Sequence, residues 1–179
     1  MSDFFAFTLL IFIFVVSVSY TVYLMMIVSG AFFGAPFIPS NKKTIKKMLE
    51  ISGAKPGEVA YDLGSGDGRF VFALADYGLH AKGVEISYPV HWYARIKQMF
   101  FAKGGRLIRG DIYKTDLRDA DIVFTYLFPN MMKRLAPKLA AELKEGSRVI
   151  SNGFPIENWT PYQKIDRLGN RGTIYLYKM

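Results

Sequence analysis

The chain has no cysteine and only two histidines, His80 and His91, among its 179 residues. The absence of cysteine excludes disulfide bonds, thiolate metal ligands and a cysteine nucleophile. Two imidazoles are too few for the usual histidine-rich transition-metal centre, so we expect no metal site.

Basic residues are absent before Lys42, and Asp3 is the only charged residue in the first 41 positions. All 23 Lys and Arg residues therefore lie in 42–179, together with 14 of the 15 acidic residues, and this part carries a net charge of +9. A charge of this sign is compatible with contacts to nucleic acid or to anionic lipid headgroups.

The first long segment, 4–28, contains no charged residue. As a helix it would be about 37 Å long, enough to cross a hydrocarbon core of about 30 Å. A buried core helix would normally keep a polar stripe, and a cleavable signal peptide would have a basic start and a shorter apolar run. We therefore expect residues 1–30 to be a retained transmembrane anchor. Four lysines follow it, which predicts a single-pass membrane protein with its C-terminal domain in the cytoplasm: Lys42, Lys43, Lys46 and Lys47.

Residues 31–53 are predicted to form a linker and a short helix before the main domain. Ser40 is the expected N-cap of a helix over about 41–51, which Gly53 would end. Two prolines disfavour helix just before it. Three linker residues are candidates for a lid over a ligand, with a plain linker as the alternative: Phe37, Ile38 and Pro39.

The remaining residues, 54–179, alternate short apolar runs with helix-like segments. Strands are expected at 58–64, 81–87, 106–113, 121–128 and 148–154, and helices at 69–78, 89–102 and 130–144. This alternation predicts an α/β fold with a parallel sheet covered on both faces. Two last strands, near 163–169 and 173–179, are joined by a short turn and should form an antiparallel hairpin at one edge.

A glycine-rich loop follows the first of these strands and reads Asp62-Leu63-Gly64-Ser65-Gly66-Asp67-Gly68. Glycines allow positive φ and let a ligand approach the backbone closely. The spacing is neither the dinucleotide G-x-G-x-x-G, because Arg69 replaces the last glycine, nor a P-loop. An acid before the glycines suits a cationic ligand better than a pyrophosphate. S-adenosylmethionine carries an ammonium and a sulfonium and no phosphate.

Two more acids stand at the ends of the next two strands, where ligands bind in open α/β sheets. Glu85 could accept the ribose hydroxyls, and Asp111 could accept the adenine amino group with Ile112 against the ring. Each acid alone could equally be a helix cap or a surface charge. Together the predicted S-adenosylmethionine contacts are Asp62, Gly64, Ser65, Gly66, Gly68, Glu85, Ile86, Asp111, Ile112 and Tyr126.

In this order, DLGSGDGR, GVEIS and GDIY resemble the class I, seven-β-strand methyltransferases. An apolar segment and PFIPS before DLGSGDGR resemble more closely the membrane-anchored lysine methyltransferases of adenine nucleotide translocase and the ATP synthase c subunit. The resemblance covers nearly the whole chain. It implies a Rossmann-like seven-stranded sheet and methylation of a lysine in a membrane or membrane-proximal protein. By position, it also assigns the cofactor to Asp62, Gly64, Gly66, Glu85 and Asp111.

The segment after the fourth strand, Thr125 to Asn130, would then supply the acceptor channel. The predicted catalytic residues are Tyr126, Phe128 and Pro129, the two rings forming the walls of a narrow slot. Core packing of one ring is the alternative, since neighbouring strand residues face opposite ways. Asn152 and Phe154 are weaker candidates.

No dedicated general base is evident, and His91 is interpreted as structural. The segment YLFPN lacks the Asn/Asp-Pro-Pro-aromatic motif of enzymes acting on base amines, which disfavours nucleic acid. Methyl transfer to a small molecule or lipid, RNA methylation and a cofactor-binding scaffold without activity remain open.

Overall fold

The computed structural model describes residues 2–32, 40–101, 104–166 and 172–179. Backbone contacts divide the chain into two units, Met1–Phe37 and Ile38–Met179. The first contains α1 (Ser2–Phe32), and the second contains all the other elements.

The second unit is built on a sheet of seven strands in the order β3-β2-β1-β4-β5-β7-β6. Its strands are β1 (Val59–Leu63), β2 (His80–Glu85), β3 (Arg106–Arg109), β4 (Ile122–Thr125), β5 (Arg148–Gly153), β6 (Gln163–Asp166) and β7 (Thr173–Lys178). The first five are mutually parallel, and β7 pairs antiparallel with both β5 and β6. The predicted α/β class and the antiparallel edge hairpin are both confirmed.

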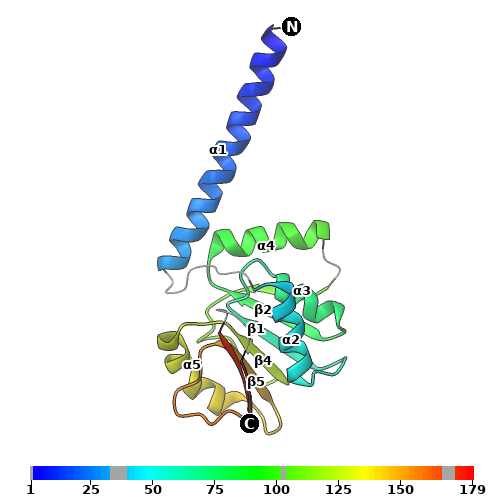
Figure 1. Cartoon of the computed structure of the whole chain (residues 1–179), viewed down its shortest axis with the longest axis vertical. Helices are drawn as coiled ribbons and strands as arrows, with labels where there is room; N and C mark the ends of the chain where they lie inside the picture. The colour runs from blue at the N-terminus through cyan, green and yellow to red at the C-terminus, as the bar shows by residue number, and fades with distance from the viewer. Residues whose placement is uncertain (1, 33–39, 102–103, 167–171) are drawn as a thin grey trace. The chain divides into compact units, whose positions relative to one another are not determined.

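Helices cover both faces of this sheet (Figure 1). They are α2 (Lys42–Ser52), α3 (Arg69–Asp76), α4 (Tyr88–Phe101) and α5 (Pro129–Glu142). Strand residues alternate between two buried clusters, so that Ala60 packs with α2 and α3, whereas Tyr61 and Leu63 pack with α5. This period-two alternation is what a two-sided sheet requires. Phe70 and Phe124 meet edge to face, with ring centroids 4.8 Å apart, in the first cluster.

Helix α2 belongs to the compact unit, because Ile45 and Met48 are buried in its core. The predicted N-cap at Ser40 is wrong. Asn41 is the N-cap, and its Oδ1 accepts a hydrogen bond from the Thr44 N–H at 2.8 Å. Asparagine is at least as good an N-cap as serine. Which of the two residues caps the helix depends on which helix residues must face the core. Gly53 ends the helix in a left-handed conformation, as predicted.

Two strands, β3 and β4, are half as long as expected. β3 ends at Arg109 because Asp111 starts a turn, in which its carbonyl accepts the N–H groups of Lys114 and Thr115 at 3.0 Å. β4 ends at Thr125, so Tyr126 and Phe128 follow the strand and do not belong to it. An apolar run predicts a strand but does not show where the hydrogen bonds to the neighbouring strands end.

The N-terminal unit is an α-helix whose stretch Phe4–Met25 has a mean hydropathy of 2.3, long and apolar enough to cross a membrane. Three of its hydroxyl groups form hydrogen bonds inside the helix. Those of Thr8, Ser19 and Thr21 donate to carbonyls four residues earlier.

Arg148, at the start of β5, joins three segments of the compact unit. Its guanidinium donates to the carbonyls of Ser52 and Gly53 at 2.8 and 2.9 Å and pairs with Glu58 at 2.5 Å. Those carbonyls end α2, where the helix cannot satisfy them itself.

We expect Arg148→Met to lower the free energy of unfolding by about 1–3 kcal/mol, because it leaves carbonyls and a carboxylate without their donor. Urea unfolding measures this change. The matched control is Arg118→Met, which removes an exposed pair with Asp116 and should leave the urea midpoint nearly unchanged. Equal shifts for the two variants would contradict the assignment.

Candidate functional site

The glycine-rich loop lies at the point where the sheet order reverses. It follows β1, which lies between β2 and β4, and it leads into α3. The N–H groups of Gly64 and Ser65 both donate to the Val84 carbonyl, at 2.9 and 3.0 Å. The loop is therefore bound to the tip of β2, the position at which ligands bind in open α/β sheets.

Backbone conformation and close packing explain why glycine occupies four positions of the site. Gly64, Gly66 and Gly68 have φ values of +83°, +54° and +76°, which side chains disfavour. A fourth position, Gly83, also requires glycine, which the sequence pattern did not reveal. A Cβ there would lie 2.4 Å from the Val71 Cγ2 and 2.8 Å from the Ser65 side chain. β2 can approach the loop and α3 only because position 83 has no side chain.

Glu85 lies at the end of β2 and binds the loop through its side chain. One carboxylate oxygen accepts the Gly66 N–H at 3.0 Å, and the other accepts the Ser87 N–H at 2.8 Å. Burial raises the pKa of Glu85, while these N–H groups and that of Ile86 oppose the rise. With about four lone-pair positions, the carboxylate can still accept a further donor.

Asp62 is buried beside Glu85. Burial, followed by the charges of Glu85 and Asp67, raises the pKa of Asp62 to about 8. Among the described residues, no cation or hydrogen-bond donor contributes to this shift. An isolated buried carboxylate is costly, and a cationic partner would relieve the cost.

Asp67, also in the loop, is a structural anchor that the sequence pattern did not indicate. Its carboxylate binds Arg69 at 2.8 Å and Lys97 of α4 at 2.7 Å. Although burial acts in the opposite direction, these two cations hold the pKa of Asp67 below its ordinary value. As the second acid of the loop, Asp67 gives no sequence signal of its role, because its partner Lys97 is thirty residues away.

Asp111 comes to the same edge as Glu85. The Gly110 N–H donates to the Glu85 carbonyl at 3.0 Å, and Asp111 follows directly. One of its carboxylate oxygens accepts the Tyr113 N–H at 2.9 Å, and Ile112 is buried beside it. The acids expected after three successive strands therefore lie together at the carboxyl ends of β1, β2 and β3. Their roles there stay predictions.

The aromatic candidates follow β4. Tyr126 is partly exposed, and a Cβ on Gly153 would lie 3.1 Å from its ring. The rings of Phe128 and Phe154 lie 5.7 Å apart between centroids. Leu127, between the two candidates, is the buried residue. Pro129 is exposed and begins α5, a position that suits its fixed φ and accounts for it structurally.

Two buried polar groups beside these rings have no partner among the described residues: Thr125 Oγ1 at the end of β4 and Asn152 Oδ1 in β5. Thr125 pairs with Leu63 on one side and with Ser151 on the other. Unpartnered buried polar atoms are unusual and often indicate a functional site. Asn152 was expected as a weaker candidate, whereas Thr125 was not singled out.

His91, interpreted from the sequence as structural, is half-buried in α4, where burial and the charges of Arg95 and Arg109 lower its pKa. Within the described ranges, no group of three His, Cys, Asp or Glu side chains is placed to hold a metal ion. The lid candidates Phe37, Ile38 and Pro39 lie outside the described residues.

The raised pKa of Asp62 predicts how stability depends on pH. Its pKa is about 8 when folded and about 3.8 when unfolded, so between these values the folded protein holds a proton that the unfolded chain has lost. The contribution of Asp62 to stability is therefore fully present below about pH 3.8 and is lost as pH rises to about 8.

We expect Asp62→Asn to remove this pH dependence. Thermal unfolding at pH 9 should find the variant more stable than wild type by more than about 1.4 kcal/mol, the free energy that corresponds to a pKa difference of one. At pH 5 the difference should be much smaller. A constant difference between the two proteins from pH 5 to pH 9 would contradict the raised pKa.

Comparison with known proteins identifies the family. Residues 62–163 match the ANTKMT methyltransferase domain model. A protein-lysine N-methyltransferase of Saccharolobus islandicus is 34% identical over 79% of this chain and 92% of its own length. In Mus musculus, a lysine N-methyltransferase of the ATP synthase c subunit is 32% identical over 80% of this chain, but this covers only 58% of the mouse protein.

Among solved structures, an RNA methyltransferase from Salinibacter ruber in complex with S-adenosyl-L-homocysteine is 33% identical, with a TM-score of 0.72. The match covers 79% of this chain and 93% of that one. The glycine loop, the strand order and these similarities agree. This chain belongs to the ANTKMT methyltransferase domain family and is a class I methyltransferase that uses S-adenosylmethionine.

Proposed function

We propose that this protein is a membrane-anchored protein-lysine N-methyltransferase that methylates the ε-amine of a lysine in a membrane or membrane-proximal protein. The observation that carries the proposal is the pair of carboxylates, Asp62 and Glu85, on a glycine loop of the class I fold. Relatives named for lysine methylation support the acceptor. One of them is the adenine nucleotide translocase lysine N-methyltransferase of Mus musculus, 33% identical over 70% of this chain and 56% of its own length.

The residues of the loop fit S-adenosylmethionine by their chemistry. Asp62 is a buried acid with a raised pKa, which suits a cationic group. Glu85 has free lone pairs for hydroxyl donors beside its two backbone N–H groups. Asp111, with Ile112, could receive the adenine. Gly64, Ser65, Gly66 and Gly68 provide a backbone surface without bulky side chains, and Ile86 and Tyr126 complete the proposed set.

When bound, S-adenosylmethionine supplies an electrophilic methyl group next to a positive sulfur. The acceptor lysine must lose its proton first, which costs about 4.6 kcal/mol at pH 7 for an ordinary pKa. An apolar channel lowers this cost, because desolvation disfavours the ammonium form. The rings of Tyr126, Phe128 and Phe154 can form this channel and exclude water.

The unpartnered oxygens of Thr125 and Asn152 can accept hydrogen bonds at the carboxyl ends of β4 and β5. The Tyr126 hydroxyl can accept a hydrogen bond from the incoming amine and so orient its lone pair. Tyr126 would thereby hold the neutral amine toward the methyl group that the cofactor supplies, and the proton that the amine gives up would pass to solvent.

Helix α1 supports the membrane location. Phe4–Met25 has the length and apolarity of a span, and three of its hydroxyls are bonded within the helix, as a lipid environment requires. The lysines at 42–47 favour a cytoplasmic domain. A shared bilayer would raise the effective concentration of a membrane substrate.

RNA methylation is the second candidate. The net charge of +9 in residues 42–179 favours it, and so does the name of the Salinibacter ruber structure. Binding to RNA would weaken steeply with added salt.

The cofactor site predicts two affinity changes. Asp62→Asn and Glu85→Gln should each weaken S-adenosylmethionine binding about 10–100-fold, since each removes a charged hydrogen-bond acceptor. Titration calorimetry measures the affinity, with Asp76→Asn, at the far end of α3, as control.

Wild-type affinity should rise with pH up to about 8, by as much as about tenfold per pH unit, because a cation binds the ionised form of Asp62. A pH-independent affinity, or equal losses in all three variants, would contradict this assignment.

The acceptor is tested with tritiated cofactor, the full-length protein and isolated membranes. We expect label in protein, resistant to nuclease and organic extraction, and recovered as methyl-lysine after hydrolysis. At a cofactor concentration below saturation, Asp62→Asn should strongly reduce it, and Tyr126→Phe should reduce the rate more than the cofactor affinity. Label found only in nuclease-sensitive material or only in the organic extract would overturn lysine methylation in favour of RNA or lipid.

A further inference from the structure

Helix α4 has an apolar surface that faces solvent. Seven large side chains on it are exposed, among them Phe101 at 84%, Met99 at 79% and Phe100 at 72%. We call this set the α4 aromatic surface: Tyr88, Trp92, Tyr93, Ile96, Met99, Phe100 and Phe101. The other described residues between 40 and 179 contribute only four exposed large apolar side chains. Exposed apolar side chains gathered in this way usually mark an interaction site.

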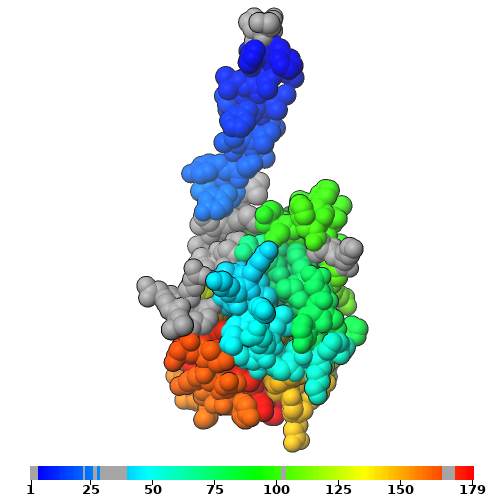
Figure 2. All heavy atoms as spheres, turned by 45° about the vertical axis from the view of Figure 1, so that its right-hand side comes forward, coloured from blue at the N-terminus to red at the C-terminus, as the bar shows by residue number. Residues whose placement is uncertain are grey.

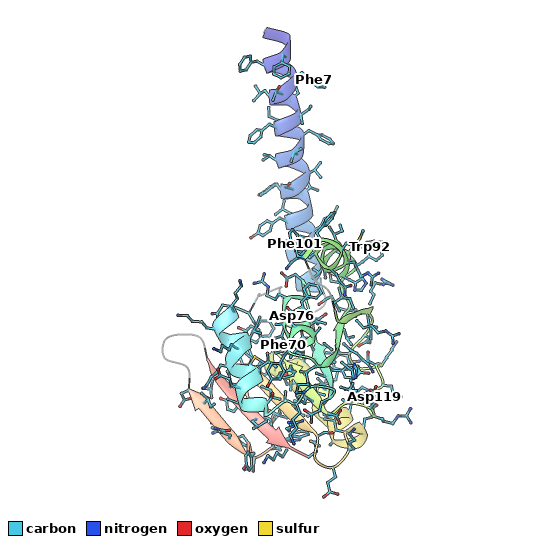
Figure 3. All side chains as sticks on the ribbon, turned by 90° about the vertical axis from the view of Figure 1, so that its right-hand side faces the viewer. Phe7, Phe70, Asp76, Trp92, Phe101 and Asp119 are labelled. Atoms are coloured by element: carbon cyan, nitrogen blue, oxygen red, sulfur yellow. The ribbon has the colours of Figure 1, made fainter. Side chains whose placement is uncertain are left out.

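Helical spacing makes the surface continuous. Tyr88, Trp92, Ile96 and Phe100 follow one another at four-residue steps, so they lie along one side of the helix. The opposite side contains Val90 and Ala94, which are buried against the domain. Figure 2 shows α4 in light green on the surface of the compact unit. Figure 3 contrasts Trp92 and Phe101, on this helix, with Phe70 in the core.

The charged side chains of α4 itself have one sign. Helix α4 contains no acidic residue, its Arg95 is exposed, and Arg109 is exposed beside it. The Arg109 guanidinium lies 5.3 Å from the centre of the Tyr88 ring. Lys97 lies 5.7 Å from the Tyr93 ring, although it is also bound to Asp67. A partner for this surface must therefore be apolar and negatively charged.

We infer that the α4 aromatic surface binds the interface of an anionic lipid bilayer. Trp and Tyr rings favour the headgroup region, and basic side chains at the same depth can contact lipid phosphates. Met99 and Phe100 can insert their side chains below that region, as in helices that lie in the plane of a membrane, and Phe101 adds exposed apolar surface at the end of the helix. This inference rests on the residues of α4 and goes beyond the acceptor lysine and the anchoring role of α1.

Attachment of α4 to the membrane would act on the candidate active site. Lys97 of α4 holds Asp67 in the glycine loop at 2.7 Å, and α4 begins three residues after Glu85. Helix α4 therefore begins at the carboxyl end of the sheet, beside the loop, and runs back to the start of β3 at Arg106. A domain held along α4 would lie with this side against the bilayer and its loop near the bilayer surface, where a membrane-embedded acceptor would be presented.

The two tryptophans of the chain allow a direct test. Trp92 is half-exposed on α4, whereas the Trp159 ring packs on Tyr177, 5.7 Å between centroids. In full-length Trp159→Phe, reconstituted in vesicles containing anionic lipid, we expect Trp92 emission to shift to shorter wavelength. Lipids brominated at a shallow acyl position should quench it. The matched control is Trp92→Phe, whose remaining Trp159 should not be quenched.

Further substitutions test which residues make the contact. In the Trp159→Phe background, Phe100→Ser with Phe101→Ser should reduce the quenching of Trp92. Tyr162→Ser, also exposed, should not. Arg95→Gln should reduce the preference for anionic over neutral vesicles. Circular dichroism establishes that each variant is folded.

Three results would overturn the inference. The first is that brominated lipids fail to quench Trp92 while acrylamide still quenches it, in vesicles that contain the protein. The second is quenching of Trp92 that Phe100→Ser with Phe101→Ser leaves unchanged. The third is Trp92 shielded from acrylamide without lipid quenching in cross-linked dimers, which would assign the surface to a second copy of the chain. Because the readout needs no methyl transfer, it stays distinguishable from failure of the proposed lysine activity.

Discussion

Glu85 ends β2 with a carboxylate that accepts the Gly66 N–H on one side and the Ser87 N–H on the other. This contact needs β2 and the glycine loop to lie very close together, and Gly83 makes that approach possible because a Cβ would lie 2.4 Å from Val71. The rest of the site follows from this packing. The loop can turn with positive φ values, α3 can begin at Arg69, and Asp62 is buried next to a second acid.

The loop holds its negative charges in two different ways. Asp67 is neutralised inside the protein by Arg69 and Lys97, and it thereby links the loop to α4. Asp62 has no such cation among the described residues, and burial raises its pKa to about 8. One acid therefore stabilises the loop, while the other is left for a ligand. Since Lys97 lies on the helix that carries the α4 aromatic surface, the same ion pair connects the proposed cofactor site with the proposed membrane contact.

Much of the fold could be predicted because its signals are local. Apolar runs, glycine spacing and strand–helix alternation located all seven strands and placed Asp62, Glu85 and Asp111 at strand ends. Errors arose at the bounds of elements, which depend on caps and turns that an apolar run does not reveal. Asn41 caps α2 in place of Ser40, and β3 stops early at the turn made by Asp111. The role of Gly83 was missed, and Thr125 was predicted only as part of the channel segment, because what these residues do depends on neighbours from other segments.

The sequence by itself determined the class of the molecule: an apolar helix able to cross a membrane, an α/β domain, and a glycine loop followed by an acid. These depend on composition and on residues close together in the chain. Only the tertiary structure decided which acid is neutralised, which described polar atoms at the ends of β4 and β5 lack a partner, and that α4 presents its aromatic residues to solvent. Each of these depends on burial and charge, which arise when segments far apart in the chain pack together.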